Sequence, residues 1–418
     1  MNILLIGCGK LGLCVAVHCA TVGHCVTVVE RDEARARFVG AGPTDADDGP
    51  PADAEPNLYR LWSTIPRSSL SVAASLHAAL QAGTTDLILV YLATTSETDK
   101  GYDTTNLTSL LANLHNSASS SSATLPPILI GCTVPPRFCD TARASFPSLR
   151  LGYHPEFIAQ GDIMAGLSSP AFSLLGTPHD LDQSTEHLFT TFVQSLAPLA
   201  PLRTMNLVEA ELAKLALNCF ITMKIAFANT VADVAAAHTT SARPTQPDSR
   251  DGRVDGSVIC EAIALDRRVG GSCLVPGYGY GGPCFPRDNR AFRTAAAAVG
   301  VPAHLATATD DANEAHHQAQ LAALLQSDVA AFTFTDVCYK KACPVPLVVR
   351  SPKARLALDL AAAGRSVTIR ERASVLAALR SEYPQEIERA GTSLHLVEVE
   401  AEAEEEEEEE QQQQPVVR

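Results

Sequence analysis

Short apolar runs alternate with polar turns along the first half of the chain. Residues 2–6 and 25–29 are continuous apolar runs, which are typical of strands buried on both faces in an α/β protein. The segment 206–237 contains neither proline nor glycine, and its alanine and branched apolar residues recur at helical spacing. We expect one long connecting helix there and a further strand over residues 366–369. The pattern predicts an α/β domain followed by a helical one.

Three polar segments interrupt this pattern. Residues 40–56 are rich in Pro, Gly and Asp, residues 116–122 are rich in Ser, and residues 241–253 form a polar insertion. Such clusters are typical of loops. We therefore expect a surface loop at each of the three positions.

A glycine motif follows the first apolar run. It comprises Gly7, Cys8, Gly9, Lys10, Leu11 and Gly12, and a helix-compatible stretch continues from it. A strand, a tight turn and a helix N-terminus in this order direct free N–H groups and the helix dipole at a pyrophosphate. The motif therefore predicts dinucleotide binding by a Rossmann-like domain.

The second apolar run ends at an acid, Glu30. A carboxylate at this position accepts a hydrogen bond from the free 2′-hydroxyl of NAD and repels the 2′-phosphate of NADP. Arg31, directly after it, weakens this preference. The sequence predicts NAD as the cofactor.

A single cysteine ends a glycine-rich turn near residue 280. The turn reads Gly279-Tyr280-Gly281-Gly282-Pro283-Cys284, and Asp288 follows four residues later. Glycines let the backbone approach a ligand, a thiolate is a strong nucleophile, and a carboxylate one helical turn away can move protons. Taken alone, the pattern fits a buried structural cysteine in a turn equally well.

Together the two glycine motifs resemble those of the nucleotide-sugar dehydrogenases, the family of UDP-glucose 6-dehydrogenase. Further segments agree with the family in order and approximate spacing from residue 1 to about 300. They are Leu92-Ala93-Thr94-Thr95, Cys132-Thr133-Val134-Pro135-Pro136, His154-Pro155-Glu156-Phe157, Glu209–Asn218 and Leu265–Gly270. The third looks like the family's Asn-Pro-Glu-Phe. Near the C-terminus, Tyr339-Lys340-Lys341 and Arg350-Ser351-Pro352 look like its Phe-Lys and Arg-Glu-Ser-Pro signatures.

The resemblance implies a set of site residues. The implied catalytic residues are Cys284, Lys214, Asn218, Asp288, Glu156 and Thr133. The implied NAD-binding residues are Gly7, Gly9, Lys10, Leu11, Gly12, Glu30, Thr94 and Thr133. The implied substrate-binding residues are Phe157, Lys214, Asn218, Arg268, Tyr280, Gly281, Phe285, Lys340 and Arg350. No metal site is expected.

The resemblance also implies a reaction, in which the C6 alcohol of a nucleotide sugar is oxidised to a carboxylate by two hydride transfers to NAD+. Cys284 would carry the sugar as a thiohemiacetal and then as a thioester, and Glu156 would activate the hydrolytic water. The base for the first step stays open between Lys214, Asp288 and a water held by Thr133 and Asp288. Lys214 and Asn218 would stabilise the oxyanions.

UDP-glucose is the expected substrate. UDP-N-acetylhexosamines, GDP-mannose, an inactive NAD-binding protein and a simpler β-hydroxyacid dehydrogenase remain alternatives, and the last has no need of Cys284. The chain departs from the family at Gln160, where a second Glu is common, at Arg287, where Lys is usual, and at Cys273-Leu274-Val275, where animal members have Phe-Leu-Lys.

The resemblance divides the chain into an NAD-binding Rossmann-like domain (1–203), a central helical dimerisation domain (204–303) and a shortened C-terminal Rossmann-like domain for the sugar nucleotide (304–400). A disordered acidic tail (401–418) follows. We expect a homodimer, in which Arg268 reaches the sugar site of the neighbouring subunit.

Charge and composition exclude several other classes. The net charge of the 418 residues is −15, but ten acids lie between Glu398 and Glu410, so the body is only mildly acidic. No basic stripe favours a nucleic acid partner. We expect no membrane span, because no apolar stretch reaches the roughly 18–20 residues required. The N-terminus lacks a signal-peptide pattern, so a cytoplasmic protein is expected. The 12 cysteines show no C-x-x-C pairing, and most are expected to be small core residues.

Overall fold

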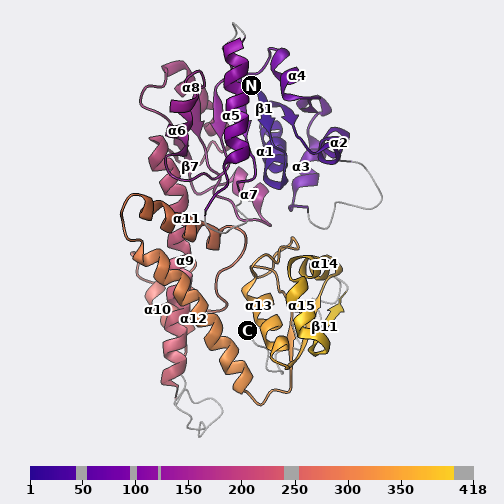
Figure 1. Cartoon of the computed structure of the whole chain (residues 1–418), viewed down its shortest axis with the longest axis vertical. Helices are drawn as coiled ribbons and strands as arrows, with labels where there is room; N and C mark the ends of the chain where they lie inside the picture. The colour runs from indigo at the N-terminus through magenta and orange to yellow at the C-terminus, as the bar shows by residue number, and fades with distance from the viewer. Residues whose placement is uncertain (44–53, 95–100, 121–123, 240–253, 400–418) are drawn as a thin grey trace. The chain divides into compact units, whose positions relative to one another are not determined.

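The computed structural model of the chain describes residues 1–43, 54–94, 101–120, 124–239 and 254–399 (Figure 1). It consists of two compact units, Met1–Ala216 and Leu217–Arg418. The division into three domains expected from the sequence is finer than these two units and stays a prediction. Part of the loop expected at 40–56, the whole insertion at 241–253 and the acidic tail lie outside the described residues.

The first unit contains an eight-stranded sheet in the order β3-β2-β1-β4-β5-β6-β7-β8. The strands are β1 (Asn2–Ile6), β2 (Cys25–Val29), β3 (Leu70–Val72), β4 (Leu87–Val90), β5 (Ile128–Ile130), β6 (Leu151–Tyr153), β7 (Ser173–Gly176) and β8 (Leu202–Met205). All neighbours are parallel except β6 and β7. The order reverses between β1 and β4, where ligands of open α/β sheets bind. The expected Rossmann-like domain is confirmed.

Helices cover both faces of this sheet, which explains the continuous apolar runs. They are α1 (Lys10–Thr21), α2 (Glu33–Ala41), α3 (Leu58–Thr64), α4 (Leu76–Gln81), α5 (Thr105–Ser120), α6 (Phe138–Ser145), α7 (Ile163–Ser168) and α8 (Gln183–Leu196). Ile3 and Leu5 pack in one core with α1, α7 and α8, whereas Leu4 and Ile6 pack in the other with α5 and α6. Each buried aliphatic side chain contributes roughly 1.5–3 kcal/mol.

The loop expected at residues 116–122 is wrong over its first part. Residues 116–120 are the end of α5, and 121–123 lie outside the described residues. Leu107, Leu111 and Leu114 are buried in the core at helical spacing, and this packing carries the helix into its serine-rich end.

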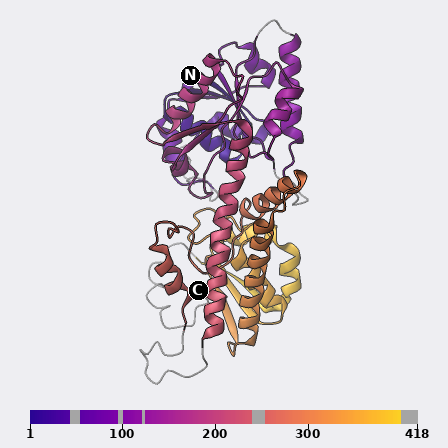
Figure 2. The ribbon, with the colours of Figure 1, turned by 90° about the vertical axis from the view of Figure 1, so that its left-hand side faces the viewer.

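The long connecting helix is confirmed as α9 (Leu207–His238), which is unbroken in Figure 2. Within the described part of the chain it is long and apolar enough to cross a membrane, by length and composition only. The expectation that no stretch reaches this limit is therefore wrong. The central helix of a globular protein meets the same criterion.

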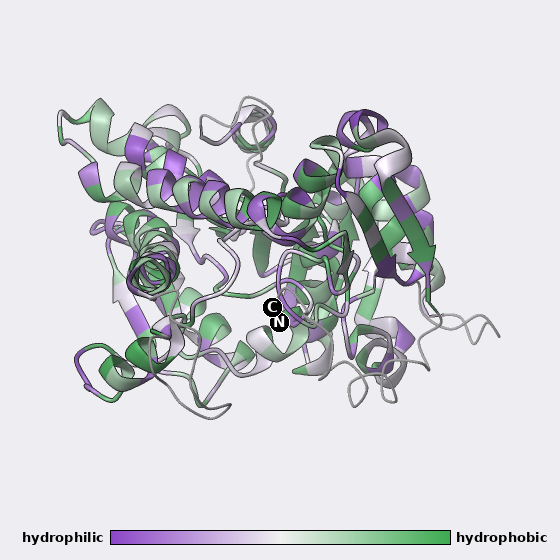
Figure 3. Cartoon of the chain, turned by 90° about the horizontal axis from the view of Figure 1, so that it is seen from below, coloured by the Kyte–Doolittle hydropathy of each residue, from purple (hydrophilic) through white to green (hydrophobic). Residues whose placement is uncertain are grey.

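The second unit contains helices and a small sheet. Its further helices are α10 (Gly256–Ala264), α11 (Phe285–Ala298), α12 (His304–Gln326), α13 (Pro352–Ala362), α14 (Ala373–Glu382) and α15 (Pro384–Ala390). The sheet is parallel, in the order β11-β10-β9, with β9 (Ala331–Phe334), β10 (Ser366–Glu371) and β11 (Leu394–Glu398). The strand expected at 366–369 is thus confirmed. Figure 3 shows that the helices carry both hydrophobic and hydrophilic residues.

Candidate active site

The first glycine turn has the shape that a pyrophosphate requires. Gly7 has a φ of +91°, and a side chain there would meet the carbonyl oxygen of Tyr91. A side chain on Gly12 would meet the carbonyl oxygen of Gly7, whereas one on Gly9 would meet only open space. Gly9 caps α1 without a side-chain hydrogen bond, so the helix start can receive an anion.

Glu30 lies beside this turn, at the end of β2. Its Oε2 accepts a hydrogen bond from Cys8 N at 2.6 Å, and its Oε1 accepts one from Asp32 N at 3.0 Å. Each carboxylate oxygen has a second lone pair. A ribose hydroxyl can therefore still donate to Glu30 while the same carboxylate holds the turn.

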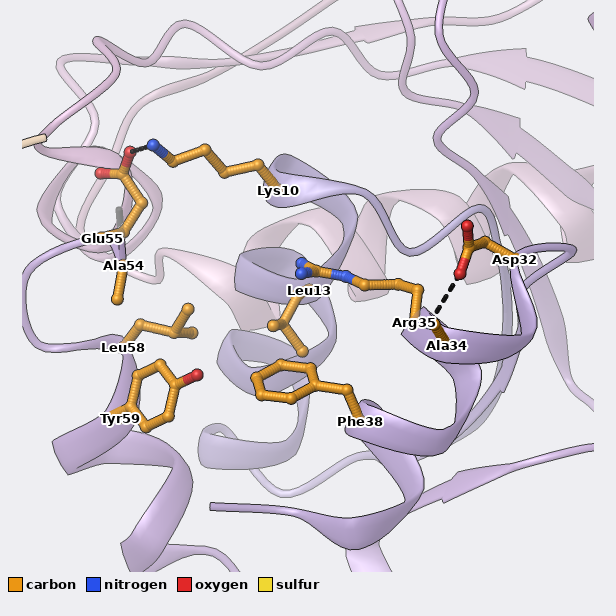
Figure 4. Close-up of a pocket in the computed structure, with 10 residues that line it drawn as sticks. All are labelled: Lys10, Leu13, Asp32, Ala34, Arg35, Phe38, Ala54, Glu55, Leu58 and Tyr59. Carbon is orange, nitrogen blue, oxygen red and sulfur yellow. Dashed lines mark hydrogen bonds and ion pairs between the residues drawn. The ribbon is translucent and has the colours of Figure 1, made fainter. Parts of the chain in front are cut away.

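A cavity of about 480 Å³ opens next to α1 and α2 (Figure 4). Its lining includes Lys10, Arg35, Phe38 and Glu55. Arg35 Nε donates to Cys8 O at 2.9 Å, and the guanidinium lies 5.4 Å from the centre of the Phe38 ring. Lys10 Nζ lies 3.2 Å from Glu55 Oε1.

Arg35 and Glu55 were missed by the sequence analysis. The buried Glu55 carboxylate also accepts from Gly161 N and Ile163 N, at 2.9 and 3.2 Å. The only sequence signal for Glu55 was an acid followed by proline directly before a helix. The two backbone N–H groups that donate to Glu55 lie more than a hundred residues away, so the sequence alone could not identify them.

These features fit NAD. The turn and the start of α1 would hold the pyrophosphate, Glu30 would hold a ribose, and Arg35 and Phe38 offer a planar cation and a ring beside the cavity for the adenine. NAD, when bound, accepts a hydride. Thr94 and Thr133 lie together at the ends of β4 and β5, because Thr94 Oγ1 donates to Thr133 O at 2.7 Å.

Glu156 and Lys214 also come together in the first unit. Lys214 Nζ donates to the backbone oxygen of Glu156 at 2.6 Å and lies 4.9 Å from the centre of the Phe157 ring. Both side chains are about nine-tenths buried. The Glu156 carboxylate accepts a hydrogen bond from Tyr91 OH at 2.7 Å, a contact that the sequence gave no means of expecting.

In the second unit, Cys284 is the N-cap residue of α11. A thiolate is stabilised at the positive end of a helix dipole. The Cys284 carbonyl oxygen accepts from Asp288 N at 2.8 Å, and the Asp288 side chain is fully buried. Asp288 Oδ2 accepts from Asn218 Nδ2 at 2.6 Å, and Oδ1 accepts from Arg287 Nε at 2.8 Å. The Cys284 backbone, Asp288 and the Asn218 side chain are thus linked by hydrogen bonds.

The glycine turn before Cys284 packs tightly on the segment 339–352. A side chain on Gly281 would meet the carbonyl oxygen of Arg350, and one on Gly282, which has a φ of +78°, would meet the Tyr339 ring. Lys340 Nζ lies 6.0 Å from the centre of that same ring. Three of the expected substrate-binding residues therefore lie at one turn.

Tyr280 is the buried member of the turn. Its hydroxyl donates to Asp310 Oδ1 at 2.5 Å and accepts from Asn289 Nδ2 at 3.0 Å. Tyr280 and Arg350 line a second cavity of about 480 Å³, to which Arg290 and Asp310 also contribute. The Tyr280 hydroxyl is thus engaged with the protein, and the sequence analysis missed Asp310.

Two expected substrate-binding residues lie outside these groups. Phe285 is the half-buried first residue of α11. Arg268 lies on the surface with 89% of its side chain exposed, and its guanidinium bonds both oxygens of Asp266. The free surface around Arg268 is compatible with a role toward another subunit.

Two family profiles match the chain. The UDP-glucose/GDP-mannose dehydrogenase family, NAD binding domain, matches residues 1–193, and the central domain of the same family matches residues 250–315. Together the matches cover more than half of the chain.

Individual relatives agree with these matches. UDP-glucose 6-dehydrogenase AglM of Haloferax volcanii is 27% identical over 336 residues, which cover 77% of this chain and 71% of the relative. A UDP-glucose 6-dehydrogenase of Rhizobium meliloti is 26% identical over 322 residues, covering 75% and 68%.

Solved structures share the fold. A UDP-glucose dehydrogenase from Pyrobaculum islandicum has a TM-score of 0.77 at 22% identity, covering 95% of this chain and 86% of its own. A UDP-D-ManNAc dehydrogenase from Pyrococcus horikoshii has a TM-score of 0.69 at 18% identity, covering 89% and 83%.

Proposed function

The chain belongs to the UDP-glucose/GDP-mannose dehydrogenase family and is an NAD-dependent oxidoreductase, and on this premise we propose that it converts UDP-glucose to UDP-glucuronate. The observation that carries the proposal is Cys284 at the start of α11, next to the buried Asp288–Asn218 pair. A dehydrogenase that stops at the aldehyde has no need of a nucleophilic thiol. A four-electron oxidation needs a group that holds the aldehyde for a second hydride transfer.

The first half-reaction removes a proton and a hydride from the C6 alcohol. The proton goes to Lys214, to Asp288 or to a water near Thr133. The Cys284 sulfur then adds to the aldehyde carbon and the aldehyde oxygen takes a proton, which gives a thiohemiacetal. Lys214 as ammonium and Asn218 as amide would stabilise the developing oxyanion, each contributing roughly 10²–10³ in rate.

The second half-reaction produces the carboxylate. The hydroxyl proton of the thiohemiacetal goes to the same base as in the first half-reaction, and loss of the second hydride then leaves a thioester. Water then adds to the thioester carbon as Glu156 takes its proton, the C–S bond breaks, and the electron pair returns to the Cys284 sulfur.

Nucleotide binding is assigned to Lys340 and Arg350, which lie beside the glycine turn. Their two positive charges would bind the diphosphate of the nucleotide. The active unit is proposed to be a homodimer. In support, α9 exposes Phe220, Phe227 and Val234 at seven-residue intervals, so that they share one side of the helix. Arg268 is proposed to reach the sugar site of the partner subunit.

The test is NADH production from a panel of UDP- and GDP-sugars at saturating NAD+. UDP-glucose should be the best substrate by kcat/KM. Activity confined to UDP-N-acetylmannosamine or GDP-mannose would contradict the choice of sugar. No NADH from any nucleotide sugar would instead favour an NAD-binding protein without this activity.

A further inference from the structure

Two side chains to which the proposed reaction assigns no role converge on one oxygen of Glu156. Tyr91, which follows β4, donates its hydroxyl to Glu156 Oε1 at 2.7 Å. His154, which follows β6, places Nε2 3.7 Å from the same oxygen. In the described part of the chain, the side-chain contacts of Glu156 are made by Oε1, and none involves the second oxygen, Oε2.

The position of Tyr91 depends on Gly131, which directly follows the neighbouring strand β5. A side chain on Gly131 would overlap the Tyr91 ring at its hydroxyl end. Tyr91 itself is only 8% exposed. Burial, together with the negative charge of Glu156, raises the pKa of Tyr91 well above its usual value. The phenol is therefore neutral and can only donate to the carboxylate.

The orientation of His154 is fixed from the other side of its ring. His154 Nδ1 lies 2.7 Å from the carbonyl oxygen of Leu174. A carbonyl oxygen only accepts, so Nδ1 carries the hydrogen and Nε2 faces Glu156.

Among the described residues, further titratable groups near this cluster are Lys214, His18, Cys19 and Cys132. Lys214 Nζ is bound to the backbone oxygen of Glu156. From α1, burial lowers the pKa of His18 and raises that of the Cys19 thiol. Burial also raises the pKa of Cys132 to about 11. None of these three groups therefore places a charge beside Glu156.

We propose that Tyr91 and His154 are positioning residues that hold Glu156 Oε1, so that Oε2 takes the proton of the hydrolytic water as the thioester is cleaved. This inference rests on the function proposed above. Tyr91 favours the carboxylate form by donating to it, and it fixes the direction in which Oε2 points. A base that is held in one orientation stays aligned with the water that it deprotonates, and the hydrolysis step is therefore faster.

The test compares Tyr91→Phe with Tyr153→Phe. Tyr153 is a fully buried tyrosine at the end of β6 whose hydroxyl has no hydrogen-bond partner in the described structure, so it is the matched control. In Tyr91→Phe the kcat should fall by about tenfold, because the Glu156 carboxylate loses the donor that holds its orientation. The KM for UDP-glucose should stay the same, and rapid-quench mass spectrometry should find more enzyme as the sugar thioester. His154→Asn should lower kcat by less.

A second measurement does not depend on turnover. In protein with ¹³C-labelled tyrosine, the Tyr91 ring carbon that bears the hydroxyl should titrate with pH, and Glu156→Gln should abolish that titration while the Tyr153 signal stays constant. An active enzyme in which Tyr91→Phe behaves like Tyr153→Phe in kcat and in thioester level would overturn the inference. An inactive wild type would overturn the proposed function, and a Tyr91 signal that ignores pH would then overturn the contact itself.

Discussion

Asp288 is fully buried, and both of its carboxylate oxygens are hydrogen-bonded, one to Asn218 and one to Arg287. A buried charge is tolerated only when it is paired and hydrogen-bonded. The pair fixes the position of the Asn218 amide, and the backbone of Asp288 is bonded to Cys284. The hydrogen bonds therefore hold Asn218, Arg287 and Asp288 in fixed positions relative to the Cys284 backbone.

The nucleophile can be tested by Cys284→Ser. A serine hydroxyl is a poorer nucleophile and a poorer leaving group than the thiol, so steady-state NADH production should fall by at least about 10³-fold. Cys25→Ser, which changes an exposed thiol in β2, is the control and should keep wild-type turnover. Two NADH per sugar at a near wild-type rate from Cys284→Ser would rule out the covalent mechanism.

Cofactor choice can be tested at Glu30. Its carboxylate holds the turn through Cys8 N and faces the ribose in the proposed complex, so NAD+ should be preferred over NADP+ by about 10²-fold in kcat/KM. Glu30→Gln should reduce this preference, whereas Glu33→Gln, at an exposed acid in α2, should not. Equal kcat/KM values for the two cofactors in the wild type would show that Glu30 does not face the 2′ position.

Among the elements, the apolar pattern predicted β1, β2, β10 and α9, because burial of a strand or helix leaves its period in the sequence. The same pattern failed at the end of α5, where core packing of distant leucines extends a helix into a serine run. The apolar pattern does not predict the contacts of Tyr91 with Glu156 and of Lys10 with Glu55, because the two residues of each pair are 65 and 45 positions apart. These contacts depend on which strands become neighbours in the sheet, and a single sequence does not record that.

The junction between α9 and α6 should give the protein a pH-dependent stability. Glu211 on α9 accepts hydrogen bonds from Arg137 N and Cys139 N at the start of α6, at 2.5 and 2.8 Å. Burial nevertheless raises the pKa of Glu211 from 4.5 to about 7. Between these two pH values the folded protein binds a proton that the unfolded chain does not, so this group stabilises the fold as the pH falls from about 7 towards 4.5.

Urea unfolding of the wild type and Glu211→Gln at pH 5.5 and pH 8 measures this effect. Relative to the variant, the wild type should gain about 2 kcal/mol in free energy of unfolding at the lower pH. Glu209→Gln, at an exposed acid two residues earlier, should show no such difference. Equal wild-type and Glu211→Gln stabilities at both pH values would contradict the assignment.

At the scale of the whole molecule, we propose that Arg268 of one subunit of a homodimer reaches the sugar site of the other subunit. Arg268→Ala should raise the KM for UDP-glucose by about tenfold and leave NAD+ affinity unchanged, because one charged contact to the sugar nucleotide is lost. Arg267→Ala, at the adjacent exposed arginine, is the control. A fully active monomer by light scattering would exclude this role.

We propose that one active site performs two successive oxidations on one sugar without releasing the aldehyde. To test this, wild-type enzyme is supplied with a limiting, known amount of UDP-glucose, excess NAD+ and an aldehyde trap. Two NADH per UDP-glucose consumed, UDP-glucuronate as product and no trapped aldehyde are expected. One NADH per sugar with a trapped UDP-sugar aldehyde would contradict this proposal.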